Sequence, residues 1–407
     1  MSELTDWGQT TLGKHCVICT GKKDVNEGEM FGIYPFFTCS RNHIYSNKFS
    51  FNTEALLIAG NGEVGNVEYY KGKFEAYQRT YVLDNFNINI QYVYHLLKYS
   101  LKDTLSRSHA GSVIQFIKLE DLTEFTFFYP KDNLEILRIV KILDTIDTAI
   151  QQTQAIINKL KQLKQGLLHD LLTRGVDAKG ELRPCYEDAP HLYKDSPLGW
   201  IPKEWEVVML DDVAIRGSGH TPNKSISSYW NGGIKWVSLA DSSKLDKIYI
   251  EETDKEISNL GIANSSAVLH PKGTVILSRD AGVGKSAILF QEMAVSQHFM
   301  AWRCSEKLNN LFLYFYLQRE KPKFEGIAIG STIKTIGLSF FKSYNLTMPP
   351  RIEQNEIVKI LMNIEHNLTV RISELEKLQN QKAALMDDLL TGRIRVTSLL
   401  QTEASST

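Results

Sequence analysis

Residues 281–286 have the amino-acid types of a phosphate-binding loop. They read Ala-Gly-Val-Gly-Lys-Ser and follow an apolar run that is typical of a strand. A phosphate-binding loop also needs a glycine five residues before Gly284, where this chain has Arg279. We therefore predict a Gly-rich turn between two strands that raises Arg279 and Lys285 toward a polyanion, with a plain surface turn as the alternative.

Zinc-like spacing occurs near the N-terminus, at Cys16, Cys19, Cys39 and His43. A metal that the fold requires should recur in both halves of the internal repeat described below. The second half has Val213–Arg216 near the equivalent place and no cysteine cluster. We therefore favour half-buried cysteines on strands and predict no metal site.

The remaining polar residues show no catalytic spacing. The 10 histidines and 47 acidic residues form no carboxylate–lysine set of the nuclease type. An Asn-Pro-Pro-Tyr-type adenine pocket and helicase motifs are also missing from the sequence. We therefore predict no catalytic residue and no cofactor in this chain.

The composition is that of an ordinary globular protein. The chain has 407 residues, 43% of them apolar and 23% charged, and its net charge is −1. The length favours two or three domains, and the charge excludes a polycation that binds nucleic acid by bulk attraction. No apolar run approaches the ~18 residues of a membrane span. Residues 1–6 are acidic and polar, unlike a secretory signal, so we expect a cytoplasmic protein without a disulfide framework.

Charge is spread evenly along the sequence. The net charge is −2 over residues 1–130, +2 over 131–180 and +2 over 201–350. Many phosphate contacts would need clustered Lys and Arg. If the chain binds DNA, it must do so with a modest basic patch, and partner subunits must supply many of the contacts with phosphate.

The sequence contains an internal repeat. Residues 135–173 align without a gap onto 353–391, at an offset of 218, with 15 identities in 39 positions. Weaker correspondences occur at an offset of 219. They join Gly111–Ile114 to Gly330–Ile333, residues 59–65 to 278–284, and Gln78 to Gln297. The chain therefore reads as a variable module, a repeated segment, a second variable module and the repeated segment again.

The repeated segments are predicted to be long helices. Their apolar residues recur at spacings of three and four over more than four heptads, with Pro130 and Pro350 upstream and Gly175 and Gly392 at the far ends. Such a narrow stripe is typical of a coiled-coil seam, and ~39 residues reach roughly 58 Å. We expect the two helices to pair with each other rather than with a second chain. The predicted seam and partner contacts are Ile142, Ile146, Leu160, Leu167, Leu171, Ile360, Ile364, Leu378, Leu385 and Leu389.

The variable modules are predicted to be α/β, with many short strands broken by Gly and Asn. Strand-like runs include Ala55–Ile58, Gly233–Leu239 and Thr274–Leu277, and each module ends in an aromatic helical stretch, residues 90–97 and 311–317. Four prolines between residues 174 and 205 indicate an extended linker. The predicted domains are a first module at 1–130, a first helix plus linker at 131–204, a second module at 205–350, and a second helix and tail at 351–407.

Several motifs carry a resemblance to a known family. They are residues 171–177 with 180–184, the stretch 195–205 that reads Asp-Ser-Pro-Leu-Gly-Trp-Ile-Pro-Lys-Glu-Trp, and residues 330–332. On these motifs and on the alternating architecture, the chain resembles the specificity (S) subunit of type I restriction–modification enzymes. The resemblance covers essentially the whole chain and is stronger in the second half.

The resemblance implies an α/β (α+β) fold of two target-recognition domains in tandem repeat, separated by two long helices that form an antiparallel coiled coil. Each module would read one half of a bipartite double-stranded DNA site, and the helices would set the spacer. Two methylation (M) subunits would dock on the chain, and restriction (R) subunits would complete an endonuclease that serves in phage defence. S-adenosylmethionine, ATP and Mg would belong to those partner subunits, so the S subunit itself has no catalytic residue.

The base-reading residues do not follow from the sequence. Polar and basic side chains in the modules suit phosphates and base edges, although each one taken singly is more readily a solvated surface charge. The candidates are Arg41, Lys71, Lys73, Arg79, Arg107, Lys224, Lys235, Arg279, Lys285 and His298.

Two other classes of function compete with this reading. A fused methyltransferase is disfavoured because the chain lacks a cofactor loop and an adenine pocket. A two-module adaptor that never binds DNA is favoured only by the near-neutral charge.

Overall fold

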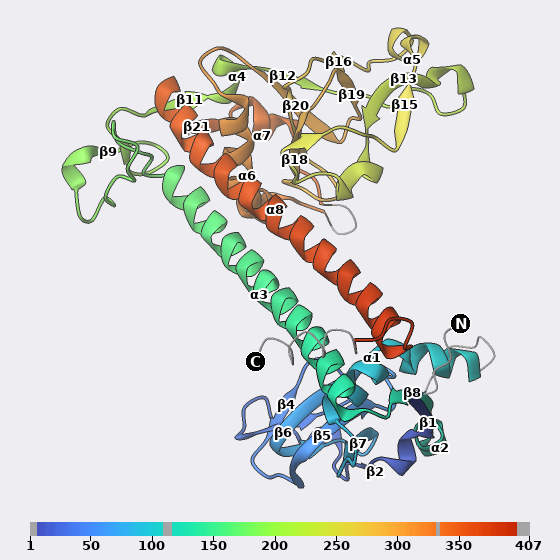
Figure 1. The fold of residues 1–407 in the computed structure, drawn as a ribbon. Coiled ribbons are helices and arrows are strands. Elements are labelled where there is room, and N and C mark those ends of the chain that lie inside the picture. Colours follow the sequence, from blue (N-terminus) through green and yellow to red (C-terminus); the bar gives the residue numbers. More distant parts are fainter. Residues whose placement is uncertain (1–5, 109–115, 331–333, 397–407) are drawn as a thin grey trace. The chain divides into compact units, whose positions relative to one another are not determined.

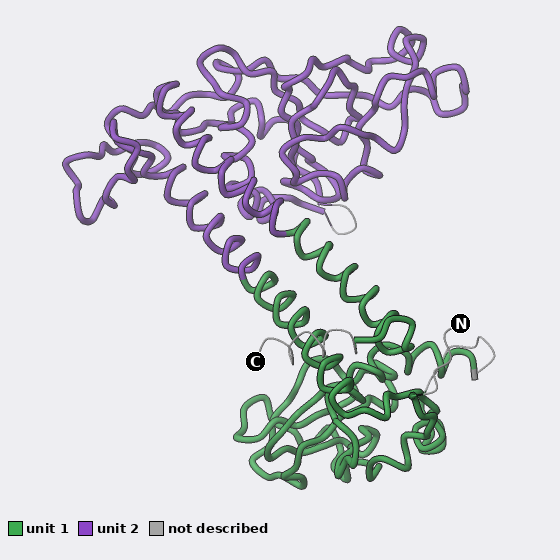
Figure 2. Tube along the Cα trace, viewed as in Figure 1, with its two compact units in different colours: residues 1–155, 372–407 green, residues 156–371 purple. Residues whose placement is uncertain are grey.

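The computed structural model describes residues 6–108, 116–330 and 334–396. The predicted motif at Gly111–Ile114, most of its repeat at Gly330–Ile333, and Met1–Thr5 therefore lie outside the described residues. The chain divides into two compact units, shown in Figure 2. Unit 1 contains residues 1–155 and 372–407, and unit 2 contains residues 156–371.

Unit 1 contains the first module, which is built on one mixed sheet (Figure 1). The apolar run from Ala55 to Ile58 lies in the middle of this sheet, where its side chains are buried. In spatial order the strands are β2 (Val17–Thr20), β7 (Thr80–Asp84), β5 (Phe51–Ala59), β6 (Val67–Ala76), β3 (Tyr34–Phe37) and β4 (Ile44–Ser46). The other elements are β1 (Trp7–Thr11), which pairs with β8 (Thr126–Pro130), and the helices α1 (Ile90–Ser108) and α2 (Leu119–Thr123).

Unit 2 contains the second module, which is built on two sheets. The larger has the order β12 (Ala214–Ser218), β20 (Phe299–Cys304), β17 (Val275–Ser278), β18 (Ser286–Leu289) and β14 (Tyr249–Ile250). The smaller has the order β15 (Lys255–Ile257), β13 (Trp230–Val237), β19 (Met293–Val295) and β16 (Leu269–His270). The remaining elements are the pair β11 (Glu206–Met209) and β21 (Asn345–Met348), with α4 (Leu210–Val213), α5 (Asn259–Ala263), α6 (Asn310–Ile327) and α7 (Leu338–Lys342).

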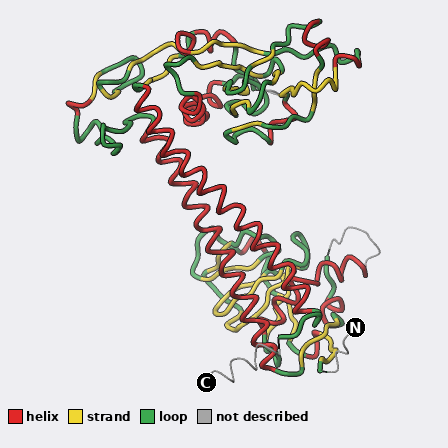
Figure 3. The backbone as a smooth tube through the Cα atoms, turned by 45° about the horizontal axis from the view of Figure 1, so that its top comes forward, coloured by secondary structure: helices red, strands yellow, loops and turns green. Residues whose placement is uncertain are grey.

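The two modules share their strand pairings. The antiparallel pairs β5–β6 and β5–β7 of the first module recur as β17–β18 and β17–β20 of the second. The parallel pair β3–β6 recurs as β13–β19, and β1–β8 recurs as β11–β21. Figure 3 shows the strands of each module and the two long helices. The prediction of α/β modules in tandem repeat with two long helices is confirmed.

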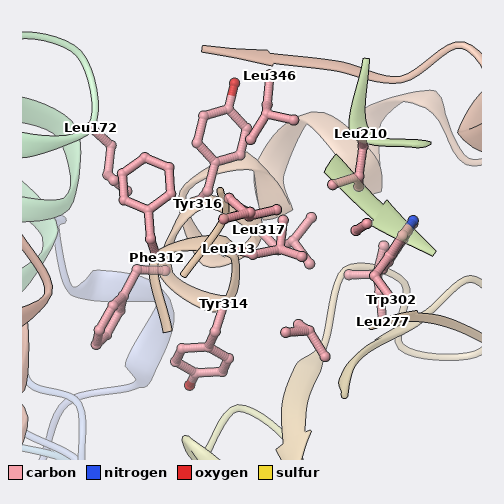
Figure 4. Packing of buried hydrophobic residues seen from close by; sticks show 14 of the residues in the cluster. Leu172, Leu210, Leu277, Trp302, Phe312, Leu313, Tyr314, Tyr316, Leu317 and Leu346 are labelled. Atoms are coloured by element: carbon pink, nitrogen blue, oxygen red, sulfur yellow. The ribbon is translucent and has the colours of Figure 1, made fainter. Parts of the chain in front are cut away.

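An aromatic helix anchors the core of the second module. Asn309 precedes helix α6 and caps it, because its side chain accepts hydrogen bonds from two amides of the first turn. Its Phe312 and Leu317 are completely buried, and Figure 4 shows them among side chains from the strands, such as Trp302. The aromatic helix of unit 1, α1, likewise buries large side chains such as Tyr92 and Leu96 in the core of that unit. Burial of these large side chains is the main free-energy gain that holds each module together.

The long helices are α3 (Asn133–Leu171) and α8 (Arg351–Leu390), and each passes from one unit into the other (Figure 2). In unit 1, Asp147 of α3 pairs with Lys382 of α8. In unit 2, Lys164 of α3 pairs with Glu365 of α8. Glu135 also binds Arg395 in unit 1, and Glu353 accepts from the Val176 amide in unit 2, so within each unit the contacting segments run antiparallel. None of the ten predicted seam residues is exposed. Four are buried (Ile146, Leu171, Ile364, Leu389) and six are half-buried (Ile142, Leu160, Leu167, Ile360, Leu378, Leu385).

The segment between α3 and the second module is packed, whereas the sequence predicted an extended linker. The short strands β9 (Tyr193–Lys194) and β10 (Ile201–Pro202) pair with each other, and Tyr193 and Ile201 are buried. The carboxylate of Glu353, at the start of α8, binds three groups of this segment and its surroundings. It pairs with Arg183 and accepts hydrogen bonds from the Val176 amide (3.0 Å) and from Nε1 of Trp205 (3.0 Å). The prolines limit regular secondary structure in this segment. The segment is nevertheless packed, because the buried carboxylate of Glu353 requires hydrogen-bond donors and the segment supplies them.

The start of α3 carries the same arrangement in unit 1. Glu135 is completely buried, and the guanidinium of Arg395 binds both of its carboxylate oxygens, at 2.6 and 2.7 Å. Glu135 and Glu353 are equivalent in the repeat. The arginine that follows each long helix therefore binds the first turn of the other long helix.

Candidate nucleic-acid interface

One turn recurs with the same backbone hydrogen bonds in both modules. In the first module it joins β5 to β6, and the Gly65 amide donates to the Ala59 carbonyl at 3.0 Å. In the second it joins β17 to β18, and the Gly284 amide donates to the Ser278 carbonyl at 2.9 Å. These pairs are 219 residues apart in the sequence. The predicted Gly-rich turn between strands is therefore present, and it has a counterpart in the other module.

A second shared hydrogen bond ties this turn to the next strand. The Gly60 amide donates to the Arg79 carbonyl at 3.0 Å, and the Arg279 amide donates to the His298 carbonyl at 2.9 Å. Both pairs again differ by 219. We call this place the repeated corner. It consists of Gly60, Gln78 and Arg79 in the first module and of Arg279, Gln297 and His298 in the second.

A glutamine lies exposed at the repeated corner of both modules. Gln78 donates from Nε2 to a carboxylate oxygen of Asp24 at 3.4 Å. Gln297 accepts at Oε1 from the Thr221 hydroxyl at 2.6 Å. In both modules the glutamine is therefore positioned by the segment that follows the second strand of the module.

Two glycines bring those segments close to the sheet. A Cβ atom on Gly21 would lie 1.9 Å from the Ala76 carbonyl oxygen, and one on Gly219 would lie 1.6 Å from that of Val295. No side chain fits at these distances, so both positions require glycine. The close approach places Asp24 and Thr221 within reach of the two glutamines.

Each repeated corner holds one arginine. In the first module it is the acceptor residue of the shared hydrogen bond, and in the second it is the donor residue. Arg79 occupies the place of His298, and Arg279 occupies the place of Gly60. Arg79 is exposed, and its guanidinium forms no ion pair with any residue that the structure describes. Arg279 is 17% exposed, and its Nε lies 3.5 Å from Asp280. Nδ1 of His298 lies 2.7 Å from the other oxygen of the same carboxylate.

The structure thus brings Arg279 and His298 together around Asp280. Nε of Arg279 has no hydrogen-bond partner, although it is buried. Ala281, the next residue, has a positive φ of 38°, a conformation that non-glycine residues rarely adopt. The arginine is therefore held on a fixed turn beside Asp280.

Sequence reasoning missed one pair of lysines beside the repeated corner. A Cβ atom on Gly65 would lie 3.2 Å from Cγ of Lys102, and one on Gly284 would lie 2.8 Å from Cγ of Lys321. Lys321 pairs with Asp246 at 2.5 Å, whereas Lys102 is exposed and forms no ion pair within the described part of the chain. The two lysines are 219 residues apart, so an extension of the repeat alignment into α1 and α6 could have found them.

The other candidates for DNA contact are dispersed. Arg41 is exposed and pairs with Glu63 at 3.2 Å, on the turn of the first module. Lys71 and Lys73 lie together near the far end of the β5–β6 hairpin, where Lys71 pairs with Glu54 and Lys73 lies over the ring of Phe49.

Two of the candidates in the second module are engaged within the protein. Lys235 pairs with Glu252 and Glu256, and Nζ of Lys285 donates to the carbonyl and hydroxyl of Ser242. Lys285 is therefore held against Ser242 and is not raised from the turn as the sequence predicted. Lys224 and Arg107 are exposed.

The three cysteines with zinc-like spacing do not fit the predicted half-buried positions on strands. Cys19 is on β2 and exposed, Cys16 is half-buried just before it, and Cys39 is buried. Burial raises the pKa of Cys16 to about 12, with a contribution from Asp84, so its thiol stays protonated at neutral pH. Among the described residues, no group of three His, Cys, Asp or Glu side chains is placed to hold a metal ion.

An apolar groove runs along the paired helices in unit 1. It has a volume of about 550 Å³ and is lined by Ile142, Ile146 and Ala149 of α3 and by Leu378 and Leu385 of α8. Arg138, Lys141 and Thr145 complete its wall. The repeat equivalents of four lining residues, at an offset of 218, are Ile360, Ile364, Leu160 and Leu167, which lie on the helix halves of unit 2. No helix in the part of the chain that the structure describes is long and apolar enough to cross a membrane.

Two of the known proteins similar to this chain are specificity subunits of type I restriction enzymes. The chain is 31% identical over 222 residues to the EcoDI specificity subunit of Escherichia coli, a match that covers 51% of the chain. It spans about half, 49%, of the length of that relative. It is 24% identical over 422 residues to the MjaVIII specificity subunit of Methanocaldococcus jannaschii, covering 97% of this chain and 94% of that one.

The fold is also similar to a solved structure. The S subunit of a type I restriction–modification system from M. genitalium superposes with a TM-score of 0.61 over 96% of this chain and 97% of that chain, at 16% identity. Residues 5–162 and 202–380 match the family described as type I restriction modification DNA specificity domain. These matches favour the specificity-subunit reading over the adaptor that never binds DNA. Because the matched stretches cover most of the sequence, the protein belongs to the family of type I restriction-modification DNA specificity domains and carries two of them.

Proposed function

We propose that this chain is the DNA-recognition subunit of a type I restriction–modification complex, in which each module reads one half of a bipartite target. The observation that carries this proposal is the agreement between sequence and fold. The two stretches that match the specificity family each contain one module, and the modules share their strand pairings and the repeated corner. One fold used twice, with different loops, suits a reader of two different half-sites.

The long helices set the unread spacer in this proposal. A helix of 39 residues is about 58 Å long, which is somewhat less than two turns of DNA at about 34 Å per turn. The half-sites are then separated by a fixed number of base pairs, which the helices determine.

Methylation subunits dock on the helices in this proposal. The groove of unit 1 exposes apolar side chains where the helices meet, and its main lining residues recur in unit 2. Two copies of one methylation subunit would therefore find equivalent surfaces, and restriction subunits would join them in the full complex. S-adenosylmethionine would act in the methylation subunits, and ATP and Mg in the restriction subunits. The complex would work in the cytoplasm, where it meets the DNA.

The test is co-expression of the chain with a cognate methylation subunit in a host that lacks DNA methylation, followed by single-molecule sequencing for N6-methyladenine. The expected result is a split motif with a fixed gap, which disappears when this chain is omitted. Methylation that is unchanged without the chain would overturn the proposal.

A second variant makes the test specific to the two modules. Replacement of residues 1–130 by a second copy of 205–350 preserves the shared strand pairings. The expected motif then has two copies of a single half-site, in opposite orientation. A motif that keeps both original half-sites would show that the modules do not read them.

A further inference from the structure

The repeated corner separates two tasks that a DNA reader must combine. If the proposed function holds, the two modules read different half-sites, yet they must sit on the same sugar–phosphate backbone. Phosphate contacts position a protein on DNA without reading its sequence, whereas contacts to base edges specify the sequence. A polar feature that recurs in both modules is therefore suited to the first task, and features that differ between them are suited to the second.

The repeated corner has the properties of the shared feature. Gln78 and Gln297 are both exposed at the same place, and each is held by one hydrogen bond to the segment after Gly21 or Gly219. The backbone beneath them is fixed by the same hydrogen bonds in both modules. Such a rigid support lowers the entropy lost when the side chains bind a ligand.

The position of the arginine carries the inference furthest. In the first module the arginine is the residue whose carbonyl accepts the shared hydrogen bond, and in the second it is the residue whose amide donates it. Both modules therefore hold a guanidinium at this corner, although Arg79 aligns with His298 and Arg279 aligns with Gly60. Reading a base edge requires one fixed geometry of donors, because a bidentate contact depends on the direction of approach. Contact with phosphate demands less, because the charge can be delivered from either side.

We infer that Arg79 and Arg279 bind the DNA backbone at equivalent places in the two modules and do not read bases. Gln78 and Gln297 supply a neutral donor beside each guanidinium. Lys102, which packs on the turn of the first module, adds a second charge there. The identity of each half-site then depends on loops outside the repeated corner. This inference rests on the proposed function and assigns part of the interface within it.

Charges near the corner leave the arginines able to bind an anion. Asp280 lies between Arg279 and His298 and orients both of them. In the first module, Asp24 caps a short helical turn, and Glu27 is paired with Lys23 at 2.6 Å. The acidic groups are therefore already engaged by donors of the protein, while Arg79 is not.

The experiment uses the complex of the full chain with its methylation subunits and measures affinity for duplex DNA over a range of salt concentrations. Arg79→Ala and Arg279→Ala are each expected to weaken binding roughly three- to tenfold, by a similar factor for target and non-target duplexes. The slope of log affinity against log salt should fall by about one in each variant. Both methylated half-sites should stay unchanged. Lys194→Ala, which removes an exposed charge on β9, outside both modules and both long helices, is the control and should change none of these quantities.

A rescue variant separates a contact with DNA from a structural role. Arg279→Ala/His298→Arg moves the guanidinium of the second module to the side that Arg79 occupies in the first. It should restore affinity and salt dependence to within about twofold of the starting protein. A merely structural Arg279 would not be replaced in this way, because the new side chain starts from another strand.

Three outcomes would overturn the inference. One is a change or relaxation of a half-site in either alanine variant, which would make the arginine a base reader. Another is normal affinity in Arg79→Ala, whose exposed side chain can be removed without disturbing the fold. The third is failure of the rescue variant when it is folded and assembled. If the starting complex neither binds nor methylates a bipartite site, the proposed function itself fails, which is distinguishable from all three.

Discussion

The ammonium group of Lys382 on α8 pairs with the carboxylate of Asp147 on α3, and both side chains are about one-fifth exposed. Lys164 and Glu365 form the corresponding pair in unit 2, each 18% exposed. At the repeat offset of 218, Asp147 is equivalent to Glu365, and Lys164 is equivalent to Lys382. The repeated helices therefore each place an acidic residue, Asp147 or Glu365, at one position and a lysine at the other, and each acid pairs with the lysine of the other helix. Antiparallel packing of two copies of one helix produces this arrangement.

We predict that these ion pairs fix the register of the helices. Lys382→Glu places two carboxylates together, and it should lower the free energy of unfolding by roughly 1–2 kcal/mol, between the values typical of exposed and of buried pairs. The charge reversal Asp147→Lys/Lys382→Glu should recover at least half of the loss. Urea denaturation of the single and double variants measures the coupling as a double-mutant cycle.

Lys377→Glu is the control, because Lys377 is exposed on the same helix. It should change the free energy of unfolding by less than about 0.5 kcal/mol. Equal effects of Lys377→Glu and Lys382→Glu would contradict the assigned role of the pair.

A second prediction concerns Glu353, whose carboxylate is shared by Arg183, Trp205 and the Val176 amide. Glu353→Ala leaves a guanidinium that is only 11% exposed without its main partner, which should cost about 3–5 kcal/mol. Glu353→Gln keeps an acceptor for two donors and should cost less. Thermal or urea unfolding of unit 2 reports both effects.

Glu356→Ala is the control, because it removes an acidic residue near the start of α8 that does not share the hydrogen bonds of Glu353. Glu356 lies one turn further along α8 and pairs with Lys359 on the surface, at 3.3 Å. Its removal should cost less than about 1 kcal/mol. A loss as large as that of Glu353→Ala would mean that any acid near the start of α8 has the same importance.

The repeat and the helices could be predicted because their signals are local. The spacing of Ile142, Ile146 and their equivalents predicts a seam, and helical periodicity needs no knowledge of distant residues. Modules of the α/β class also follow from short apolar runs such as Ala55–Ile58. Trp7 and Trp205 lie at equivalent places, 198 residues apart, but only scattered residues match near the N-terminus of each module, so the sequence carries little signal there.

The interface was harder to predict, because the sequence does not show whether a basic side chain is free to bind DNA or is already paired with an acceptor inside the protein. Lys235 and Lys285 were candidates on residue type alone, and their acceptors, Glu252 and Ser242, come from other segments of the module. The repeated corner depends on hydrogen bonds between strands that are distant in sequence. The matches of residues 59–65 with 278–284 and of Gln78 with Gln297 pointed to its place but not to its hydrogen bonds.

The third prediction concerns His95, which is completely buried in unit 1. Its Nε2 lies 2.8 Å from Asp144 and its Nδ1 lies 3.9 Å from Asp147. Burial lowers the pKa of His95 below its usual 6.5, and the two carboxylates only partly oppose this effect. As the pH falls below 6.5, the unfolded chain binds a proton that the folded chain does not, so stability should decrease. Urea midpoints at pH 7.5 and 5.5 should therefore differ more for the starting protein than for His95→Gln.

His270 provides an internal comparison for this effect. Burial also lowers the pKa of His270, which lies in unit 2. The variant His95→Gln/His270→Gln should lose more of the pH dependence than either single variant. An unchanged pH dependence in both single variants would show that carboxylates, not these histidines, govern stability in this range.

The fourth prediction concerns the apolar groove of unit 1. Leu378→Glu places a charge against Ile142 and Ile146, in the groove proposed as a docking surface. It should reduce the number of methylation subunits recovered with the chain from two to one, because the equivalent surface of unit 2 is intact. Native mass spectrometry of the purified complex measures this. The repeat equivalent, Leu160→Glu, should give the same result, and the double variant should recover none. Two bound subunits in every variant would exclude the groove as the docking surface.

The last prediction concerns the length of the paired helices. A seven-residue insertion between Asp147 and Lys164 of α3, matched by one between Glu365 and Lys382 of α8, preserves the seam and both ion pairs. Seven helical residues add about 10 Å, and a base pair occupies about 3.4 Å along DNA. If the helices set the spacer, the methylated motif should gain about three unread base pairs while both half-sites keep their sequence. Insertion into α3 alone breaks the antiparallel register, so that variant should lose methylation. A new half-site in the matched variant, or an unchanged gap, would show that the spacer is fixed by something other than α3 and α8.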